Sequence, residues 1–153
     1  MYDVLYKQLE SIKLDLKKRS GFNNRLGFPE HRGAVFGIIK PRYKQQIKQL
    51  SLYSKKYPKI YDEIIRIGKE VCPFPFTSIQ VNKNCQCPPH KDKSNVGDSC
   101  LVSFGEYTGG HIYIEGVKYN AYHNPIIFDG HKLEHWNDDH IGTKYSLVFF
   151  NLK

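Results

Sequence analysis

Long apolar runs are absent from this sequence of 153 residues, and so is a recognisable leader segment. A membrane-spanning helix needs about 20 mostly apolar residues in succession, and no stretch of the chain approaches that length. The opening segment, MYDVLYKQLE, lacks the charged and apolar regions of a secretory signal peptide. We therefore expect a protein without membrane contact that works inside the cell, in the cytoplasm or the nucleus.

Cysteine is scarce, and the four cysteines, Cys72, Cys85, Cys87 and Cys100, form no Cys-x-x-Cys pair. The cytosol keeps thiols reduced, so we expect no disulfide bonds. Cys85, Cys87 and His90 are a candidate zinc set, because zinc prefers thiolate and imidazole ligands. Their spacing matches no common zinc motif, which argues against that interpretation.

Acidic residues are few in the first half of the chain. Residues 1–80 contain 16 Lys and Arg against 7 Asp and Glu, whereas residues 81–153 contain 7 against 8. A basic surface attracts phosphate groups through charge and counterion release, so the first half is a candidate contact for nucleic acid. A solvated helix surface accounts for the same charge, and charge alone does not decide between the two.

The composition, with 40% hydrophobic, 14% aromatic and 25% charged residues, excludes a disordered or fibrous chain. A chain of this length suits one domain, which we place at residues 1–153, and we expect a monomer. Within it, residues 1–75 are expected to be mainly helical support, and residues 76–153 to form a β-rich core.

Three helical segments are expected in the first half, because apolar residues recur there at steps of three and four. The first is marked by Tyr2, Leu5, Tyr6, Leu9, Ile12 and Leu16 and ends at KKRSGFNN, residues 17–24. The second opens at Pro41 and is marked by Tyr43, Ile47, Leu50 and Tyr53. The third follows Pro58 and is marked by Ile60, Ile64, Ile67 and Val71. Between the first two, residues 34–40 (AVFGIIK) read as a short strand.

From residue 76 onward the apolar period changes to two, which is typical of strands. Strand candidates are residues 78–82, 100–105, 111–119, 124–130 and 144–152, and Glu115-Gly116 is expected to form a hairpin turn. Short strands with glycine-rich turns, preceded by helices, predict an α+β fold: a jelly-roll or barrel with the helices packed outside it.

His90 and Asp92, in the segment PPHKDKSN, are candidate metal ligands. In an extended segment, residues two apart project to the same side, so both can face one point. Two imidazoles and a carboxylate on one face of a metal form the facial triad of non-haem Fe(II) oxygenases. The residues alone leave the third ligand open among the downstream histidines His111, His123, His131, His135 and His140.

Lys144 and Ser146 lie two apart in GTKYSLVFF and should share one face of an otherwise apolar strand. A cation and a hydroxyl at this spacing can hold a carboxylate by an ion pair and a hydrogen bond. A buried lysine without such a partner would be costly. The pair therefore predicts a carboxylate-binding site.

The ordered set of His90-x-Asp92, a distal histidine and a basic residue two positions before a serine resembles the 2-oxoglutarate- and Fe(II)-dependent dioxygenases. In that family the distal histidine precedes the basic residue on the neighbouring strand, and His135 precedes Lys144 by nine positions. The resemblance therefore selects His135, with His131 as the main alternative.

The resemblance covers about residues 78–150 and includes a paired glycine, Gly109-Gly110, between the metal motifs. It implies a double-stranded β-helix with Fe(II) held by His90, Asp92 and His135. His111, His123 and His140 are then expected on loops or hairpin surfaces.

The same resemblance implies 2-oxoglutarate as co-substrate, held by Lys144 and Ser146, with O2 as oxidant and ascorbate as a supporting reductant. Asn82 is a further candidate near the keto-acid end of 2-oxoglutarate.

Within the family, HKDKSN and KYSLVFF are similar to motifs of the TET and J-binding-protein-like enzymes, which oxidise methyl groups on nucleic-acid bases. This similarity implies base contacts by Asn95 and Phe150. Two departures are visible, because Lys144 stands where that branch has arginine, and Phe150 and Leu152 stand where it has tyrosine and histidine.

We expect a dioxygenase that hydroxylates a methyl group of 5-methylcytosine or thymine in nucleic acid, in DNA rather than RNA. An enzyme of this kind must flip the base or act on a single strand. The basic first half, with Lys91 and Lys93, could hold the phosphates. The alternatives are a prolyl-type protein hydroxylase and a cupin-like metal-binding barrel without enzymatic activity.

Overall fold

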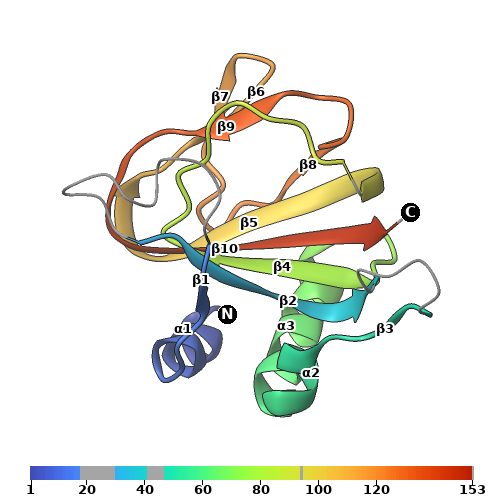
Figure 1. The fold of residues 1–153 in the computed structure, drawn as a ribbon. Helices are drawn as coiled ribbons and strands as arrows, with labels where there is room; N and C mark the ends of the chain where they lie inside the picture. The colour runs from blue at the N-terminus through green and yellow to red at the C-terminus, as the bar shows by residue number, and fades with distance from the viewer. Residues whose placement is uncertain (18–29, 41–46, 94, 153) are drawn as a thin grey trace.

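Two antiparallel β-sheets face each other, and helices cover the outer side of the larger sheet (Figure 1). The computed structural model describes residues 1–17, 30–40, 47–93 and 95–152. The helices are α1 (Asp3–Glu10), α2 (Leu52–Lys56) and α3 (Pro58–Val71). The strands are β1 (Asp15–Leu16), β2 (Arg32–Ile39), β3 (Gln49–Leu50), β4 (Ser78–Lys83), β5 (Asn95–Gly109), β6 (Ile112–Ile114), β7 (Val117–Tyr119), β8 (Ile126–Phe128), β9 (His135–Asn137) and β10 (His140–Leu152).

The larger sheet has the order β1-β2-β4-β10-β5-β8, with β3 paired to β2, and the smaller sheet has the order β7-β6-β9. Strand β10 lies at the centre, between β4 and β5. Its register sets Ser146 opposite both Asn82 of β4 and Ser103 of β5. The two long strands β5 and β10 therefore form the platform on which the inner polar residues are arranged.

The main hydrophobic core lies between the larger sheet and the helices, outside the space between the two sheets. Alternate residues of β10, Leu147 and Phe149, are fully buried there against helix residues such as Ile64 and Ile67. Because side chains alternate along a strand, Lys144 and Ser146 are directed to the opposite, inner side. The helices thus stabilise the sheet from behind and leave its inner face available for polar chemistry.

The first helix is shorter than its apolar pattern predicts. It ends at Glu10, and Asp15–Leu16 form a strand that pairs with Gly33 and Arg32 of β2. Pairing with the sheet thus overrides a helical period that continues to Leu16. Of the expected end of this helix, residues 17–24, only Lys17 belongs to the described residues.

The second helical prediction is wrong over residues 47–51. Leu50 belongs to β3, and Ile47 is 86% exposed. The helix begins only at Leu52, where the Ser51 side chain caps it by accepting a hydrogen bond from the backbone N–H of Ser54. Pro41 and Tyr43 lie outside the described residues.

The third helix is confirmed. It begins at Pro58, ends at Val71, and buries Ile60, Ile64 and Ile67 as its period requires. No helix among the described residues is long and apolar enough to cross a membrane.

The β-rich second half is confirmed as antiparallel sheets, and the turn at Glu115-Gly116 joins β6 to β7 with φ values of 48° and 78°. Such left-handed dihedrals are those of a two-residue type I′ hairpin turn. The first half is less helical than predicted, because β2 pairs with β4 inside the larger sheet. The expected helical support, residues 1–75, therefore also contributes strands to the larger sheet.

Candidate active site

His90, Asp92 and His135 lie together, although 43 positions separate the last two in the sequence. The Nε2 atom of His90 is 3.6 Å from Asp92 Oδ1, and that of His135 is 3.5 Å from Asp92 Oδ2. One ligand atom from each residue lies within 4.8 Å of the other two. The set offers two imidazole nitrogens and a carboxylate to a single ion, which is the donor set of the Fe(II) facial triad.

Backbone pairing holds the two imidazoles in place. His90 and His135 form an isolated antiparallel bridge with N···O distances of 3.0 Å in both directions. Each ring also places its Nδ1 against a carbonyl two residues earlier, Pro88 for His90 at 2.8 Å and Leu133 for His135 at 2.9 Å. An Nδ1–H that donates to a carbonyl leaves the Nε2 lone pair available to a metal, so both rings are oriented as ligands.

Asp92 is the charged member of the set. Its burial raises the carboxyl pKa, but the imidazoles of His135 and His90 beside it outweigh burial and hold the pKa well below its usual range. The interaction with Asp92 in turn raises the pKa of His90, although burial of the imidazole acts in the opposite direction. Asp92 is therefore an anion, as a metal ligand must be.

Gly130 and Asn95 shape the space around Asp92. A Cβ atom at Gly130 would lie 2.5 Å from Asp92 Oδ2, so only glycine leaves the carboxylate in place. The Asn95 amide donates to Asp92 Oδ2 at 3.5 Å and to Ser99 Oγ at 3.3 Å. Asn95 is thus a buried neighbour of the carboxylate.

His131, the alternative third ligand, contacts the backbone of Asp92 instead of facing its carboxylate. Its Nδ1 lies 2.9 Å from the Asp92 carbonyl oxygen, and its side chain is exposed. The structure therefore brings His135, and not His131, to His90 and Asp92. His123 lies on a loop as expected.

His140 departs from the expected surface position. It is the first residue of β10, is buried, and places Nε2 3.2 Å from Asn84 Oδ1. Burial and the nearby Lys144 charge lower the pKa of its imidazole. The prediction failed because β10 begins four residues earlier than its apolar pattern indicates. His111 is half-buried beside Asp138, whose Oδ2 is 3.2 Å from His111 Nδ1.

Lys144 is the most deeply buried charged residue of the candidate site, with 2% of its surface exposed. Its Nζ donates to the Gly110 carbonyl at 2.9 Å and lies 5.9 Å from the centre of the Tyr107 ring. Burial lowers the pKa of Lys144, and the acidic groups of Cys85, Asp138 and Cys87 act against that effect.

A carboxylate ligand fits this position. Among the described residues, no carboxylate forms an ion pair with Lys144. An ammonium group has three donors, and burying it without an anion is costly. Ser146, 6% exposed, shares its face of β10 and stands across from Ser103. The pair can therefore supply an ion pair and a hydrogen bond to one end of a dicarboxylate.

Asn82 and Phe150 occupy different ends of the inner surface. Asn82 stands opposite Ser146, and its Oδ1 is 3.2 Å from His31 Nε2. Phe150 is buried. The two residues that follow it on β10, Asn151 and Leu152, pair with Val96 and Asn95 of β5. Phe150 therefore lies at the Asn95 end of β10, and Lys144 at the other end.

Sequence reasoning missed several residues that complete this site. Tyr107 lies beside Lys144, and burial raises the pKa of its hydroxyl to about 12. Asn84 fixes the backbone of Lys144 by accepting its N–H at 3.0 Å. Gly130 left a weak signal, since it directly precedes the histidine-containing segment, but a lone glycine in a loop has many explanations.

No family model and no curated protein matches the sequence. The structure is similar to NgTET1 in complex with 5mC DNA, with a TM-score of 0.63 and 16% identity over 99% of this chain and 67% of that one. The chain has the fold of the 2OG-Fe(II) oxygenases. A 2OG-Fe(II) oxygenase family oxidoreductase from Burkholderia pseudomallei matches with a TM-score of 0.55 and 14% identity, over 97% of this chain and 75% of that one.

A Pseudomonas putida prolyl-4-hydroxylase also shares the oxygenase fold, with a TM-score of 0.51 and 11% identity over 98% of this chain and 83% of that one. Together with the two facing antiparallel sheets, these likenesses agree with the predicted double-stranded β-helix core, although the chain is mostly β with few helices and not the α+β fold predicted. At such low identities they do not assign a substrate.

Proposed function

We propose that the protein is a 2-oxoglutarate- and Fe(II)-dependent dioxygenase that hydroxylates a methyl group of a nucleic-acid base, 5-methylcytosine or thymine. The observation that carries this proposal is a His-Asp-His set and a buried lysine on the inner side of one oxygenase-type fold. Neither a metal-binding barrel nor a simple scaffold needs the buried cation.

The residues divide the work between metal and co-substrate. His90, Asp92 and His135 would hold Fe(II), and Lys144 with Ser146 would hold the far carboxylate of 2-oxoglutarate. With both bound, the site supplies the oxidising power that inserts an oxygen atom from O2 into a C–H bond while 2-oxoglutarate is decarboxylated to succinate. The protein itself orients the carboxylate, keeps Asp92 ionised and excludes water from the inner surface.

The substrate end is proposed to lie around Asn95 and Phe150. Asn95 contacts Asp92, and Phe150 lies at the same end of β10, away from Lys144, so a substrate there would approach the metal from the side opposite the co-substrate anchor. Support for a base as substrate comes from the similarity to NgTET1 in its complex with 5mC DNA. Asn95 would then have two tasks, holding Asp92 and meeting the base edge.

Phosphate contacts are proposed from lysines next to the triad and not from the helices. Lys91, Lys93 and Lys132 are exposed and lie within three residues of Asp92 or His135. The lysines of α2 and α3 sit on the layer behind the larger sheet, on the side away from the inner surface (Figure 1). The basic residues of these two helices are therefore not placed to contact a substrate at the triad.

A prolyl-type protein hydroxylase is the second candidate. It is favoured by the similarity to the Pseudomonas putida prolyl-4-hydroxylase and by a lysine, rather than an arginine, as the co-substrate anchor. A lysine offers a point charge where arginine offers a planar fork.

Mass spectrometry of nucleosides separates these candidates. The protein is incubated with methylated or unmodified DNA, iron, 2-oxoglutarate and ascorbate, and the DNA is then digested and analysed. We expect a hydroxymethylated base that depends on iron and 2-oxoglutarate and is absent with Asp92→Ala. Unmodified nucleosides, together with hydroxylation of a proline-containing peptide, would instead support the second candidate.

A further inference from the structure

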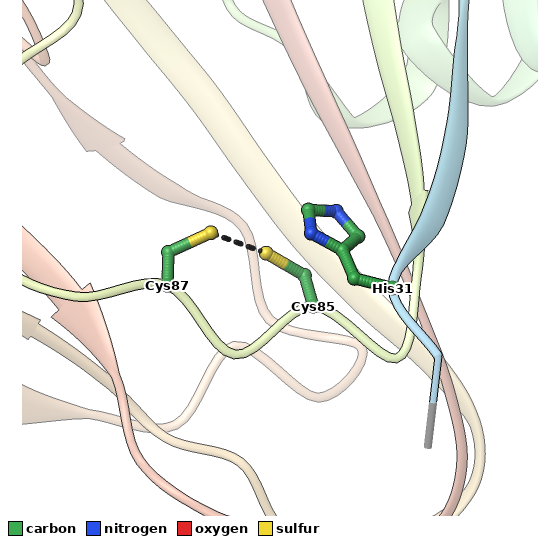
Figure 2. A group of neighbouring side chains, drawn as sticks. All are labelled: His31, Cys85 and Cys87. Carbon is green, nitrogen blue, oxygen red and sulfur yellow. Dashed lines mark hydrogen bonds between the residues drawn. The ribbon is translucent and has the colours of Figure 1, made fainter. Parts of the chain in front are cut away.

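A second cluster of metal-ligating side chains lies outside the His-Asp-His set: His31, Cys85 and Cys87 (Figure 2). One ligand atom from each lies within 4.8 Å of the other two, and the two sulfurs are 2.7 Å apart. His31 and Cys85 are 8% and 7% exposed. The cluster is therefore a nearly closed group of one nitrogen and two sulfurs.

The imidazole of His31 is oriented as a ligand. Its Nε2 is 3.2 Å from the Asn82 side-chain oxygen, which can only accept a hydrogen bond. Nε2 therefore carries the proton, and the lone pair is on Nδ1. Figure 2 shows the Nδ1 side of the ring turned toward the sulfur of Cys85. A histidine whose second nitrogen donates to a fixed acceptor is the usual arrangement at a metal site.

Two of the three residues, His31 and Cys87, are held by backbone hydrogen bonds from separate parts of the chain. The His31 carbonyl, just before β2, accepts from the N–H of Lys17 at 2.8 Å. The Cys87 carbonyl, in the segment between β4 and His90, accepts from the N–H of Asn137 at 3.2 Å. The donor atoms are thus brought together by the fold, and a metal would find the site largely formed.

We propose that His31 Nδ1, Cys85 Sγ and Cys87 Sγ bind one Zn²⁺. Thiolate sulfur and imidazole nitrogen select zinc, whereas the nitrogen and carboxylate set at His90, Asp92 and His135 suits Fe(II). Zinc takes four ligands, and the fourth position falls to a water or to the Asn137 carboxamide oxygen, 3.9 Å from Cys85 Sγ.

Charge balance favours this occupant. Two thiolates and one Zn²⁺ form a neutral group, which can be buried at lower electrostatic cost than two negative charges alone. The cluster stands within electrostatic reach of the buried Lys144, so its total charge matters to the neighbouring site. A neutral zinc group leaves the lysine free to attract a carboxylate.

A zinc ion at this cluster would cross-link the start of β2 to the segment that carries His90. Cys87 is three residues before His90, so a bound zinc would fix the approach to the first ligand of the triad. This inference does not depend on the proposed oxygenase activity, because its ligands and its metal are different.

Metal analysis of the purified protein tests the proposal. Protein prepared without added metal, then passed through a desalting column, is expected to retain close to one zinc per chain by inductively coupled plasma mass spectrometry. The double variant Cys85→Ser/Cys87→Ser should lose it, and the control Cys72→Ser should keep it. Retention of zinc by the double variant would overturn the assignment.

Cobalt substitution gives a readout on the unchanged wild-type chain. Metal-free wild-type protein titrated with Co²⁺ should develop a thiolate-to-cobalt charge-transfer absorption at one equivalent, and His135→Ala should develop the same absorption. No such absorption would contradict the proposal. So would a Cys85–Cys87 disulfide found by mass mapping of protein purified under reducing conditions, since that bond would consume both ligands.

Discussion

At the residue scale, two kinds of group carry the proposed chemistry. Two imidazoles and an ionised carboxylate at His90, Asp92 and His135 offer a metal three ligands, and the buried Lys144 offers an anion one charge. The two neighbouring imidazoles lower the pKa of Asp92 and keep it ionised, whereas burial lowers the pKa of Lys144 and disfavours its charge.

The identity of the third metal ligand is tested by two histidine variants. His135→Ala should abolish iron-dependent turnover, because His135 Nε2 faces the Asp92 carboxylate. His131→Ala should keep most of it, because the His131 ring is directed at the Asp92 backbone carbonyl. Turnover is measured as succinate formed, and exchanged phenotypes would show that the third ligand is wrongly assigned.

Lys144→Ala is expected to raise the KM for 2-oxoglutarate by about 10- to 100-fold, because a charge-assisted hydrogen bond contributes roughly 1.5–3 kcal/mol. The affinity of the His-Asp-His set for metal, measured by Co²⁺ titration of protein whose cysteine site is filled with zinc, should change little. Lys83→Ala is the matched control, since Lys83 lies one strand away and pairs with Glu10 on the outer side. An unchanged KM in Lys144→Ala would remove this residue from the co-substrate site.

The lowered pKa of Lys144 also predicts a pH dependence of stability. Between the folded pKa and the unfolded value of 10.5, the unfolded chain holds the proton and the folded chain has released it, so the free energy of unfolding should rise with pH. Below that window the contribution is constant. The test compares urea unfolding of wild type and Lys144→Met without ligand, and the stability of wild type relative to the variant should increase with pH. A relative stability that decreases would mean that the folded pKa is raised.

At the scale of the elements, the long strands β5 and β10 and their glycines position the lysine. Gly110 directly follows β5 with φ 64°, and a Cβ atom there would lie 3.0 Å from Lys144 Cδ and 3.2 Å from Nζ. Gly116 has a similar φ of 78° in the β6–β7 turn, where no atom of the described residues lies within 4 Å of such a Cβ. Both glycines therefore have a positive φ that disfavours other residues, but only Gly110 lies against Lys144.

Gly110→Ala and Gly116→Ala separate backbone strain from contact with Lys144. Both variants should lose about 1 kcal/mol of stability, because alanine is strained at positive φ. Only Gly110→Ala should also raise the KM for 2-oxoglutarate, since its methyl group displaces the lysine. Equal KM values in the two variants would show that Gly110 has no part in placing Lys144.

The strands with alternating residues and helix α3 were predictable, whereas the limits of α1 and α2 were not, for a physical reason. The half-buried strands β4 and β10 alternate apolar and polar residues, so Ile79, Val81 and Leu147 mark their outer face directly. The end of α1 and the start of α2 depend on β1 and β3 pairing with β2, and nothing local announces such long-range pairing.

The candidate site was foreseen only in part. The spacing of His90 and Asp92 and the pair Lys144 and Ser146 are local patterns. His31, in contrast, joins Cys85 and Cys87 only through the fold, 54 positions before Cys85, so the sequence pointed instead to the nearby His90 as their partner. The roles of these residues stay predictions until the variants are measured.

At the scale of the whole molecule, the larger sheet separates the helices from β9. The helices with their lysines lie behind this sheet, and β9, which begins at His135, lies on its inner side (Figure 1). A net charge of +8 attracts nucleic acid from a distance but does not by itself place it at the metal.

DNA binding should depend on the lysines near the triad. Lys91→Ala/Lys93→Ala should weaken DNA binding. In a plot of the logarithm of the binding constant against the logarithm of the salt concentration, the slope should become shallower by about 0.9 for each phosphate that the variant no longer neutralises. The matched control, Lys55→Ala/Lys56→Ala on α2, should leave the slope unchanged. Fluorescence anisotropy at several salt concentrations measures both, and the reverse result would place the DNA on the helical face.

Asn95→Ala should reduce base oxidation more than DNA binding, because a contact to a base edge selects the substrate while lysines hold the backbone. Oxidised nucleosides and anisotropy are measured on the same variant. Since Asn95 also contacts Asp92, cobalt affinity is measured in parallel. Equal reductions in oxidation and DNA binding would remove Asn95 from base selection.

The most direct test of the proposed chemistry is whether the chain converts 2-oxoglutarate to succinate. Wild-type protein with Fe(II), O2, ascorbate and methylated DNA is assayed by mass spectrometry for succinate, beside Asp92→Ala and Lys144→Ala. We predict succinate with wild type, none with Asp92→Ala, and recovery with Lys144→Ala only at raised 2-oxoglutarate. Wild-type protein that binds iron at His90, Asp92 and His135 but forms no succinate with DNA, peptide or no substrate would contradict the proposed function.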